Sequence, residues 1–298
     1  MITLTRVSPM TTIQDGGRTG MLAYGIGASG PMDRTGYVQA RTVADAPCGA
    51  AIEIGPQGLD FIYSGAPTTA GLAGGHFNLS VDGTQHPWPA RIELAEGAVV
   101  SIQTGAEGNY AYLRFAAQIG VPPVLGSRAT NATVGLGGME GRALRSSDRL
   151  DLVPLTDAPP EPVPPKAVSV DGPIRFIWGI HADLFAPTVR QAFISASFQV
   201  SARMDRMGVK LDDTDAVFAG TRNLGLVSDA VVPGDIQILG EGTPIVLMRD
   251  NQPTGGYPRI GTIIDADLDR FAQIRAGRTV RFIPVTVDHA HAISGWKR

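Results

Sequence analysis

Alternation of hydrophobic and polar residues is the main pattern along this chain. Phe77, Leu79 and Val81 alternate with polar neighbours, and Asp82 with Gly83 follows them as a strong hairpin-turn signal. The same alternation, or a continuous apolar run typical of a buried strand, recurs at 110–115, 174–178, 244–248 and 279–287. The 37 glycines and 22 prolines supply the turns that many short strands require. These segments predict a mainly β protein.

A smaller part of the chain predicts helices. Segment 33–45 follows Pro31, and proline suits the start of a helix. Segment 265–275 places its apolar residues on one face, which favours a second helix. Segment 183–193 contains Pro187, which limits a helix there to its first turn or restarts it. We therefore expect a few short helices beside the strands.

A proline-rich segment marks the best domain boundary. Five prolines lie within 158–166, and this composition predicts a semi-rigid polyproline connector. The chain is then expected to form an N-terminal domain over 1–157 and a C-terminal domain over 167–298. Because both parts are rich in strand signals, we expect two closed or nearly closed β-barrels.

The composition excludes several classes of protein. A hydrophobic content of 43% and a charged content of 18% rule out wholesale disorder. The net charge of −3, without any block rich in lysine and arginine, argues against a nucleic-acid partner. The single cysteine, Cys48, excludes an internal disulfide and a thiolate metal cluster. His289 and His291 have strand spacing but lack a nearby third ligand, so no metal site is expected.

The sequence also shows no signal-peptide pattern and no membrane-spanning pattern. Residues 1–10 contain no apolar core of a signal peptide, and no segment approaches the length that spans a bilayer. We therefore expect a cytoplasmic protein with no membrane partner.

The most informative candidate for chemistry follows the apolar run 244–248. Gly255 and Gly256 let the backbone approach a ligand and direct N–H groups toward an anion. Gln252, Thr254, Tyr257 and Arg259 surround these glycines with hydrogen-bond donors. The alternative interpretation is an ordinary surface turn.

Four further glycine-containing regions combine flexible backbone with charged groups: 13–18, 27–33, 125–142 and 201–208. Their candidate residues are Asp15, Arg18, Ser29, Asp33, Arg128, Asn131 and Arg206. Arginine binds carboxylates with paired hydrogen bonds, backbone N–H groups stabilise a developing oxyanion, and a carboxylate accepts a proton. Together these regions predict a site for a small carboxylated or amide substrate.

Each of these residues also has a structural interpretation. Asp33 lies where an acidic residue caps a helix, and Arg18, Arg128 and Arg206 are able to tie loops together through backbone carbonyls. Ser29 does not occupy the G-x-S-x-G pattern of a nucleophile elbow. Both interpretations stay open at the level of the sequence.

Phosphate-binding and carrier motifs are absent from the sequence. The segment 137–142 lacks the Gly-Lys-Ser/Thr ending of a Walker A loop, and no Rossmann fingerprint follows a strand. No lysine lies in an Ala-Met-Lys-Met-like segment that carries biotin. Chemistry that uses ATP or biotin would therefore have to be completed by a partner.

An ordered series of motifs resembles the family called allophanate hydrolase subunit 2, KipA-like or biotin-dependent carboxyltransferase. The series covers nearly the whole chain and reads I-Q-D-x-G-R at 13–18, S-G-x-M-D at 29–33, G-S-R-x-T-N at 126–131, G-R-x-L at 141–144, D-R-M-G-x-x-L at 205–211, P-G-x-I-Q at 233–237 and T-G-G-Y-P at 254–258. The best-assigned bacterial members of that family are the C-type subunits of an ATP-hydrolysing 5-oxoprolinase.

The resemblance implies a fold, partners and activities. It implies two cyclophilin-like β-barrel domains and a KipI-like partner of the B type, from the allophanate hydrolase subunit 1 family. In 5-oxoprolinase a LamB/YcsF-type subunit joins them, and the complex opens a lactam at the expense of ATP. In urea carboxylase the corresponding halves move a carboxyl group from biotin to urea, so the alternative is a carboxyltransferase half that works with a separate biotin carrier. A further alternative is a KipA-like regulator without catalysis.

Roles for individual residues complete the leading hypothesis. Arg18, Arg128 and Arg206 would hold carboxylate-like groups, with Ser29, Asn131 and Thr254 beside them in the substrate loops. Gly255 and Gly256 would supply backbone donors, Gln252 and Tyr257 would orient the substrate, and Asp15 or Asp33 would accept a proton. The chain departs from the family pattern at 179–181, 202–204, Asn251 and Pro253, which leaves the substrate open.

Overall fold

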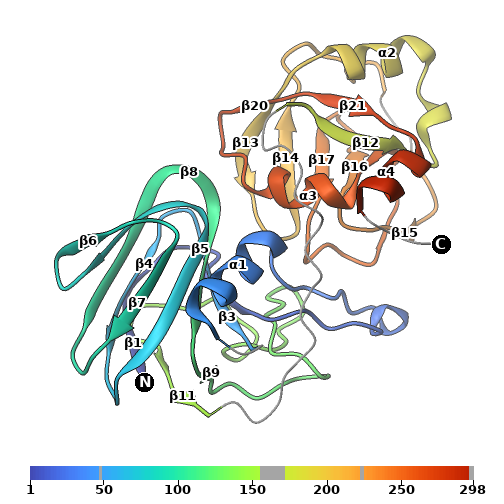
Figure 1. Cartoon of the computed structure of the whole chain (residues 1–298). Coiled ribbons are helices and arrows are strands. Elements are labelled where there is room, and N and C mark those ends of the chain that lie inside the picture. Colours follow the sequence, from blue (N-terminus) through green and yellow to red (C-terminus); the bar gives the residue numbers. More distant parts are fainter. Residues whose placement is uncertain (47–48, 155–171, 222–224, 295–298) are drawn as a thin grey trace. The chain divides into compact units, whose positions relative to one another are not determined.

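The computed structural model describes residues 1–46, 49–154, 172–221 and 225–294 and divides into two compact units (Figure 1). Unit 1 comprises Met1–Met21 and Ala28–Pro164, and unit 2 comprises Leu22–Gly27 and Pro165–Arg298. Each unit is built mainly from curled β-sheet with a few short helices, so the expected fold class is confirmed. The expected proline-rich connector at 158–166 and the residue Cys48 lie outside the described residues.

A long strand, β8 (Val99–Phe115), organises the sheet of unit 1. One of its edges pairs with β5 (Thr68–Val81), and the other pairs first with β4 (Leu59–Tyr63) and then with β3 (Ala51–Ile54). Because β8 spans 17 residues, two shorter strands fit along the same edge. The other strands of unit 1 are β1 (Ile2–Val7), β2 (Thr12–Gln14), β6 (Thr84–His86), β7 (Ala90–Leu94), β9 (Gln118–Ile119), β10 (Arg149–Leu150) and β11 (Leu152–Val153).

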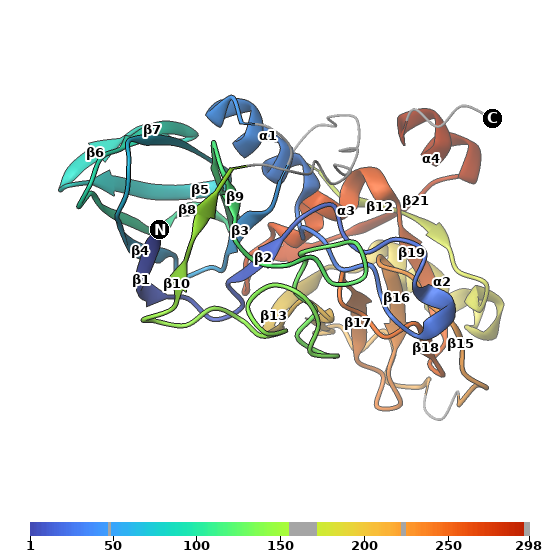
Figure 2. The same ribbon diagram turned by 90° about the horizontal axis from the view of Figure 1, so that it is seen from below.

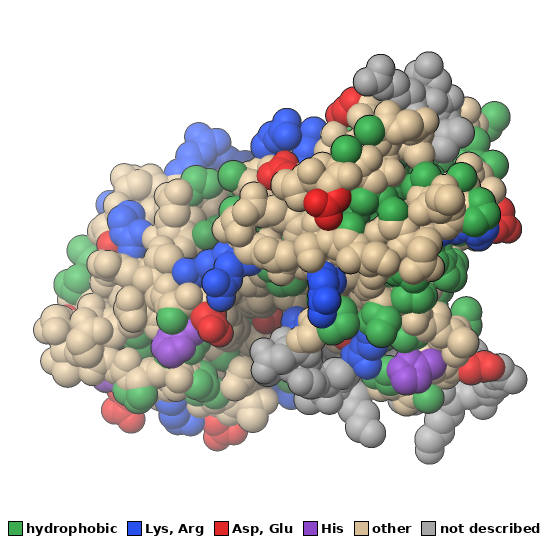
Figure 3. All heavy atoms as spheres, turned by 90° about the horizontal axis from the view of Figure 1, so that it is seen from above, with side chains coloured by type: hydrophobic (Ala, Val, Ile, Leu, Met, Phe, Trp, Pro, Cys, Tyr) green, Lys and Arg blue, Asp and Glu red, His purple; other side chains and the backbone are tan. Residues whose placement is uncertain are grey.

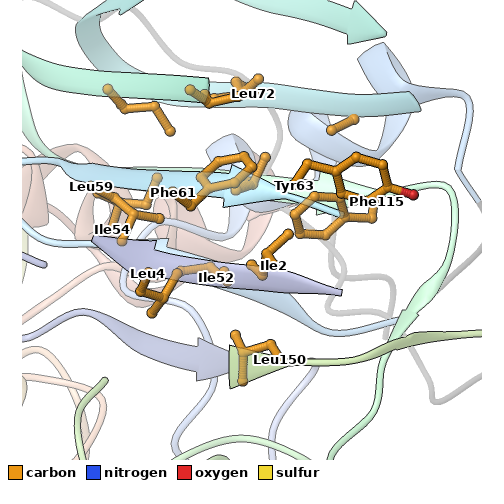
Figure 4. Packing of buried hydrophobic residues seen from close by; sticks show 14 of the residues in the cluster. Ile2, Leu4, Ile52, Ile54, Leu59, Phe61, Tyr63, Leu72, Phe115 and Leu150 are labelled. Carbon is orange, nitrogen blue, oxygen red and sulfur yellow. The ribbon is translucent and has the colours of Figure 1, made fainter. Parts of the chain in front are cut away.

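The core of unit 1 lies inside this curled sheet (Figure 4). Phe61 on β4 and Phe115 on β8 pack edge to face with ring centroids 6.2 Å apart. The opposite face of β8 is also buried, since Tyr112 packs against Tyr37 of helix α1 (Arg34–Ala44). This helix approaches β5 so closely that a Cβ at Gly71 would lie 2.2 Å from the Ala40 carbonyl oxygen. The alternation at 110–115 therefore marks a strand that is buried on both faces.

Unit 2 contains a sheet with the strand order β20-β13-β14-β17-β16-β19-β12-β21, in which only the pair of β12 and β21 is parallel among the described residues. Its inner face packs around an aromatic cluster in which the Phe193 and Phe282 rings stack at 5.2 Å. A separate ribbon of two short strands, β15 and β18, completes the unit (Figure 2). The strands are β12 (Ile174–Trp178), β13 (Phe198–Met204), β14 (Gly208–Asp212), β15 (Asp229–Ala230), β16 (Asp235–Ile238), β17 (Pro244–Leu247), β18 (Thr254–Gly255), β19 (Arg259–Ile263), β20 (Thr279–Val280) and β21 (Phe282–Pro284).

Most of the local predictions are confirmed. Asp82 and Gly83 both have positive φ angles of 49° and 80°, as a tight hairpin turn between β5 and β6 requires. The helix expected at 33–45 is α1, and the helix expected at 265–275 is α3 (Asp265–Ala272). Pro187 restarts the chain as expected, since a 3-10 turn at Ala182–Leu184 precedes it and α2 (Pro187–Ser195) begins with it.

The prediction of a single strand at 279–287 was wrong. The short strands β20 and β21 end at Pro284, and helix α4 (Val287–Ser294) follows. The Thr286 hydroxyl accepts a hydrogen bond from the His289 N–H at 3.1 Å, which caps the first turn of that helix. His289 and His291 therefore lie on a helix, and their strand-like spacing carries no meaning.

Charged side chains of both signs are dispersed over the face shown in Figure 3, where lysine or arginine side chains lie among aspartate and glutamate side chains. None of the helices in the described ranges is long and apolar enough to cross a membrane.

Candidate functional site

The outward face of the unit 2 sheet carries a row of side chains from adjacent strands. Lys210 on β14 lies opposite Ile245 on β17, and Ile245 lies opposite Gln237 on β16. Gln237 in turn lies opposite Arg259 on β19. Residues that face each other on paired strands project to the same side of a sheet, and their sequence neighbours project to the other side. Those neighbours are the core residues Val209, Leu211, Ile236, Val246 and Ile260.

A cavity of about 470 Å³ lies over this row, entirely within unit 2. Strands β14, β16 and β17 form its floor. Its walls come from the end of β13, where the register shifts between Val200 and Met204, and from the turn that follows β17. The lining residues are Ala202, Arg203, Met204, Asp205, Met207, Gly208, Lys210, Gln237, Leu239, Ile245, Leu247, Gln252 and Tyr257.

Several hydrogen-bond donors in this cavity have no partner within the described part of the chain. Gln237 is 1% exposed, and its Nε2 atom meets no acceptor there. The side chains of Lys210, Gln252 and Tyr257 likewise make no hydrogen bond or ion pair with any described residue. Of these four side chains only Gln237 is buried, and a buried donor without an acceptor lowers the stability of the folded chain. The Gln237 amide therefore indicates a place where a ligand binds.

The positive charges in the cavity favour binding of an anion. Arg203 and Lys210 contribute two positive charges. The carboxylate of Asp205 is already engaged, because its Oδ1 atom accepts hydrogen bonds from the backbone N–H groups of Met207 and Gly208 at 2.8 and 3.0 Å. In the described ranges, no three His, Cys, Asp or Glu side chains gather as a metal ion would require.

Apolar side chains complete the walls and the floor. They belong to Met204, Met207, Leu239, Ile245 and Leu247. A mostly apolar cavity of a few hundred Å³ with a small number of polar groups is typical of a small-molecule site. The arrangement therefore suits a small ligand that combines an apolar body with negatively charged or carbonyl oxygens.

The glycine turn at 254–257 helps to build this cavity. Gly255 lies against Gln237, and a Cβ atom at position 255 would stand 2.7 Å from the Gln237 Nε2 atom. At Gly256 a Cβ atom would stand 2.8 Å from the Leu226 carbonyl oxygen. Both glycines thus permit close packing, and the turn brings Gln252 and the half-exposed Tyr257 to the cavity. Thr254 is exposed on β18 and does not line it.

Arg259 fastens the ribbon of β15 and β18 to the sheet. Its Nη1 atom donates to the Ala230 carbonyl at 2.5 Å, and its Nη2 atom donates to Asp229 Oδ2 at 2.7 Å. The backbone N–H of Arg259 donates to His181 Nδ1 at 3.3 Å. Burial and the nearby positive charge of Arg259 hold the pKa of His181 below its ordinary value, so this imidazole accepts hydrogen bonds in its neutral form.

Arg206 does not line the cavity. Its guanidinium donates two hydrogen bonds to Asp250, from Nε to Oδ2 at 2.8 Å and from Nη2 to Oδ1 at 3.0 Å. Both side chains are buried, with 6% and 3% of their surface exposed. The expected role of Arg206 in substrate binding stays a prediction, and the observed geometry gives this residue a structural role.

In unit 1 the structure brings Asp15, Arg18 and Arg128 together in a buried cluster of loops. Both Asp15 oxygens accept hydrogen bonds, Oδ1 from the Ser127 hydroxyl at 2.5 Å and Oδ2 from the Arg128 N–H at 2.6 Å. The Arg18 side chain donates to the carbonyls of Val124 and Ala129, and Arg128 Nε donates to the Val121 carbonyl. These contacts join the loops to one another, so the structural interpretation of the three residues fits the geometry.

Asp33 and Asn131 of unit 1 also hold local structure, whereas Ser29 does not. Asp33 is the N-cap of α1, and its Oδ1 atom accepts from the Gly36 N–H at 2.9 Å. Asn131 Oδ1 accepts from the N–H groups of Thr133 and Val134. Ser29 has a φ angle of 57°, and its buried hydroxyl meets no partner in the described part of the chain. Proton acceptance by Asp15 or Asp33 therefore stays a prediction without geometric support.

Sequence reasoning missed Lys210 and the side chain of Gln237 as site residues. Each is a polar residue between apolar neighbours in a strand, in the segments Val-Lys-Leu at 209–211 and Ile-Gln-Ile at 236–238. That alternation already indicates that the polar side chain leaves the core. Only the pairing of β14, β17 and β16 shows that both side chains reach the same cavity.

Comparison with known proteins identifies the family. The carboxyltransferase domain, subdomain A and B, matches residues 24–284. The chain is 33% identical over 294 residues to the C-type subunit of 5-oxoprolinase from Escherichia coli (strain K12), a match that covers 97% of this chain and 93% of that protein. It is 26% identical over 313 residues to urea amidolyase of Saccharomyces cerevisiae, and there the match spans 98% of this chain but 17% of the relative.

A solved structure shares the fold. The crystal structure of the Kluyveromyces lactis urea carboxylase superimposes with a TM-score of 0.85 and 26% sequence identity, over 97% of this chain and 28% of that one. Both the family match and this superposition extend across most of the chain. The chain therefore belongs to the family of the carboxyltransferase domain, subdomain A and B.

Proposed function

We propose that this chain is the C-type subunit of a 5-oxoprolinase-like complex that hydrolyses an amide or lactam at the expense of ATP, together with a KipI-like subunit of the B type. The observation that carries the proposal is the 33% identity to the C-type subunit of a 5-oxoprolinase across nearly the full length of both proteins. The cavity of unit 2 is the part of this chain that holds the substrate.

The chemistry of the cavity supports a role in amide hydrolysis. Attack on an amide carbonyl builds negative charge on its oxygen, and donors fixed beside that oxygen lower the barrier. Gln237 and Gln252 supply amide N–H donors, and Tyr257 supplies a hydroxyl. These side chains also orient the substrate, which reduces the entropy lost on reaching the transition state.

Binding of ATP is assigned to the partners. The sequence lacks a Walker A loop, and the donors of the cavity suit a small carboxylate or carbonyl group. When bound in the complex, ATP would supply the phosphoryl group that activates the amide. A LamB/YcsF-type subunit completes the proposed assembly.

Reconstitution tests this function. ATP hydrolysis and glutamate formation are measured with this chain alone, and then with the LamB/YcsF-type and KipI-like partners, in the presence and absence of 5-oxoproline. Glutamate formation that requires the full mixture is the expected result. A well-formed complex that releases neither ADP nor glutamate contradicts the proposal.

The carboxyltransferase half of a biotin-dependent enzyme is the second candidate. The TM-score of 0.85 to urea carboxylase and the family match favour it. Here biotin is attached to a separate carrier, and the carboxylated ureido ring is the ligand of the cavity. Transfer of labelled carboxylate from free carboxybiotin to urea, with no response to 5-oxoproline, would select this candidate over the first.

A further inference from the structure

We infer that Lys210 and Gln237 form a recognition pair that selects a small planar amide carrying a carboxylate, with the ammonium on the carboxylate and the Gln237 amide on the carbonyl oxygen. This inference rests on the proposed position of the substrate in the cavity of unit 2. It does not depend on which complex the chain enters.

Lys210 is placed to bind an anion. It projects outward from β14 between Val209 and Leu211, whose side chains fill the core. The other lysines of the chain are Lys166 and Lys297, which lie outside the described residues. Among the described residues Lys210 has no ion-pair or hydrogen-bond partner, although most arginines of the chain do. A half-buried ammonium beside apolar walls attracts a carboxylate more strongly than an exposed one does.

Gln237 is placed to donate to a carbonyl oxygen. Its side chain is buried, and its Nε2 atom lacks an acceptor within the described part of the chain. Gly255 packs beside this atom, and a Cβ atom at position 255 would require the Gln237 amide to shift. A buried amide left unsatisfied destabilises the free protein, whereas a ligand oxygen restores its hydrogen bond. The residue thus favours ligand binding at the expense of the stability of the free chain.

The spacing of the pair sets the size of the ligand. One strand, β17, lies between β14 and β16, so the two backbones stand about 10 Å apart. Ile245 of β17 lies between them and gives the ligand an apolar floor. Both side chains line the same cavity of about 470 Å³, which has room for a small ring. A ring amide with a carboxylate at one end matches this arrangement.

The test compares three probes on the full chain by isothermal titration calorimetry. 5-Oxoproline carries both groups, 2-pyrrolidinone lacks the carboxylate, and cyclopentanecarboxylate lacks the amide. The wild-type chain is expected to bind 5-oxoproline at least about tenfold more tightly than either of the others, since each lost contact is worth about a factor of ten.

Variants assign the two contacts. Lys210→Met is expected to weaken 5-oxoproline binding about tenfold and to leave 2-pyrrolidinone binding unchanged. Gln237→Met is expected to weaken both lactams and to spare cyclopentanecarboxylate, while the melting temperature of the free chain stays the same or rises. Arg278→Met removes an exposed charge of unit 2 outside the cavity and is expected to change nothing.

Two results overturn the inference. One is a Lys210→Met chain that keeps the preference for 5-oxoproline, and the other is a wild-type chain that binds all three probes alike or not at all. If the wild type shows the expected selectivity but the reconstituted complex does not hydrolyse 5-oxoproline, the proposed function fails and the recognition pair stands. If the complex turns over and the selectivity is missing, the recognition pair fails alone.

Discussion

Among single residues, the arginines and Lys210 differ in the contacts that they make within the described part of the chain. The three arginines that were expected to bind substrate, Arg18, Arg128 and Arg206, donate hydrogen bonds within the chain, to loop carbonyls or to Asp250. The planar guanidinium fits such bidentate and forked contacts. Lys210 has no such contact among the described residues, and it is the residue that we propose for binding the carboxylate of a ligand.

Replacing Arg206 tests this division of tasks. Arg206→Met leaves the buried Asp250 carboxylate without its guanidinium, and we expect the free energy of unfolding to fall by about 3–5 kcal/mol. Urea denaturation followed by circular dichroism measures the change. The double variant Arg206→Met with Asp250→Asn removes both charges and is expected to recover part of the loss.

The same Arg206→Met variant also distinguishes a structural role of Arg206 from a role in substrate binding. The measurement is a titration with 5-oxoproline under conditions where the variant is folded. The structural role predicts unchanged affinity for 5-oxoproline. A loss of affinity without a loss of stability would instead restore its predicted role in substrate binding.

Among the secondary-structure elements, helices α1 and α3 are each held at their start by a carboxylate. Asp33 caps α1, and Asp267 in the first turn of α3 binds Arg175 of β12 through Oδ1 to Nη2 at 2.6 Å and Oδ2 to the backbone N–H at 2.7 Å. The first contact fixes the residue at which α1 begins, and the second holds the first turn of α3 against β12. They explain why acidic residues at predicted helix starts are weak evidence for catalysis.

A pair of substitutions at Asp33 distinguishes a cap from a base. Asp33→Ala removes the oxygen that accepts from Gly36, and we expect a loss of about 1 kcal/mol in thermal or urea unfolding. Asp33→Asn keeps an effective cap, so its stability should stay near that of the wild type. Normal turnover by the Asn variant in the reconstituted complex is expected; an inactive yet stable Asn variant would show that the carboxylate accepts a proton.

The ion pair of Asp267 makes stability depend on pH. Burial alone would raise the pKa of Asp267, but hydrogen bonds from the side chain and backbone of Arg175 outweigh burial and hold that pKa below its ordinary value. The unfolded chain has the ordinary value of about 3.9, so the stabilisation is complete above that pH and is lost as the pH falls through the lower value of the folded state.

We therefore expect the Asp267→Asn variant to be less stable than the wild type at neutral pH, by about 3 kcal/mol. Between about pH 5 and pH 2, the free energy of unfolding should fall less for this variant than for the wild type. Urea denaturation at a series of pH values measures both. Parallel curves for the two chains would show that Asp267 is not the group that titrates.

For the molecule as a whole, substitutions in the cavity test the proposed substrate binding separately from assembly with partner subunits. All of its lining residues belong to unit 2, and Lys210 and Gln237 sit on its floor. We expect Lys210→Met and Gln237→Met chains to assemble with the partner subunits, with the same mass by light scattering as the wild type. Their turnover of 5-oxoproline should fall at least about tenfold, because each lost contact is worth a factor of that order.

The same comparison tests the regulatory alternative. A KipA-like regulator acts through its partner interface, so full function of the assembled complex with both cavity variants would favour that alternative. Loss of assembly in these variants would mean that the cavity residues bind the partner instead of a small molecule.

Local features of this protein follow from its amino-acid sequence without any knowledge of the fold. Alternation, turn residues and Pro187 predict the hairpin at 82–83, the strand at 174–178, the short helices and the restart at α2, because each depends on neighbours a few residues apart. The ordered motifs indicate the family, although they do not separate ligand-binding residues from those that hold loops. Asp15 and Gln252 both lie in glycine-containing motifs, yet one is buried in a cluster of loops and the other lines the cavity.

The tertiary structure decides which polar side chains form hydrogen bonds within the chain. Lys210 and Gln237 lie on either side of β17 through pairings between strands distant in sequence, and no local pattern specifies that register. Arg206 donates to Asp250, 44 residues later in the chain, and only the folded structure shows this contact. Hydrogen-bond partners are set by long-range packing, so a donor's availability to a ligand is known only once every internal acceptor has been placed.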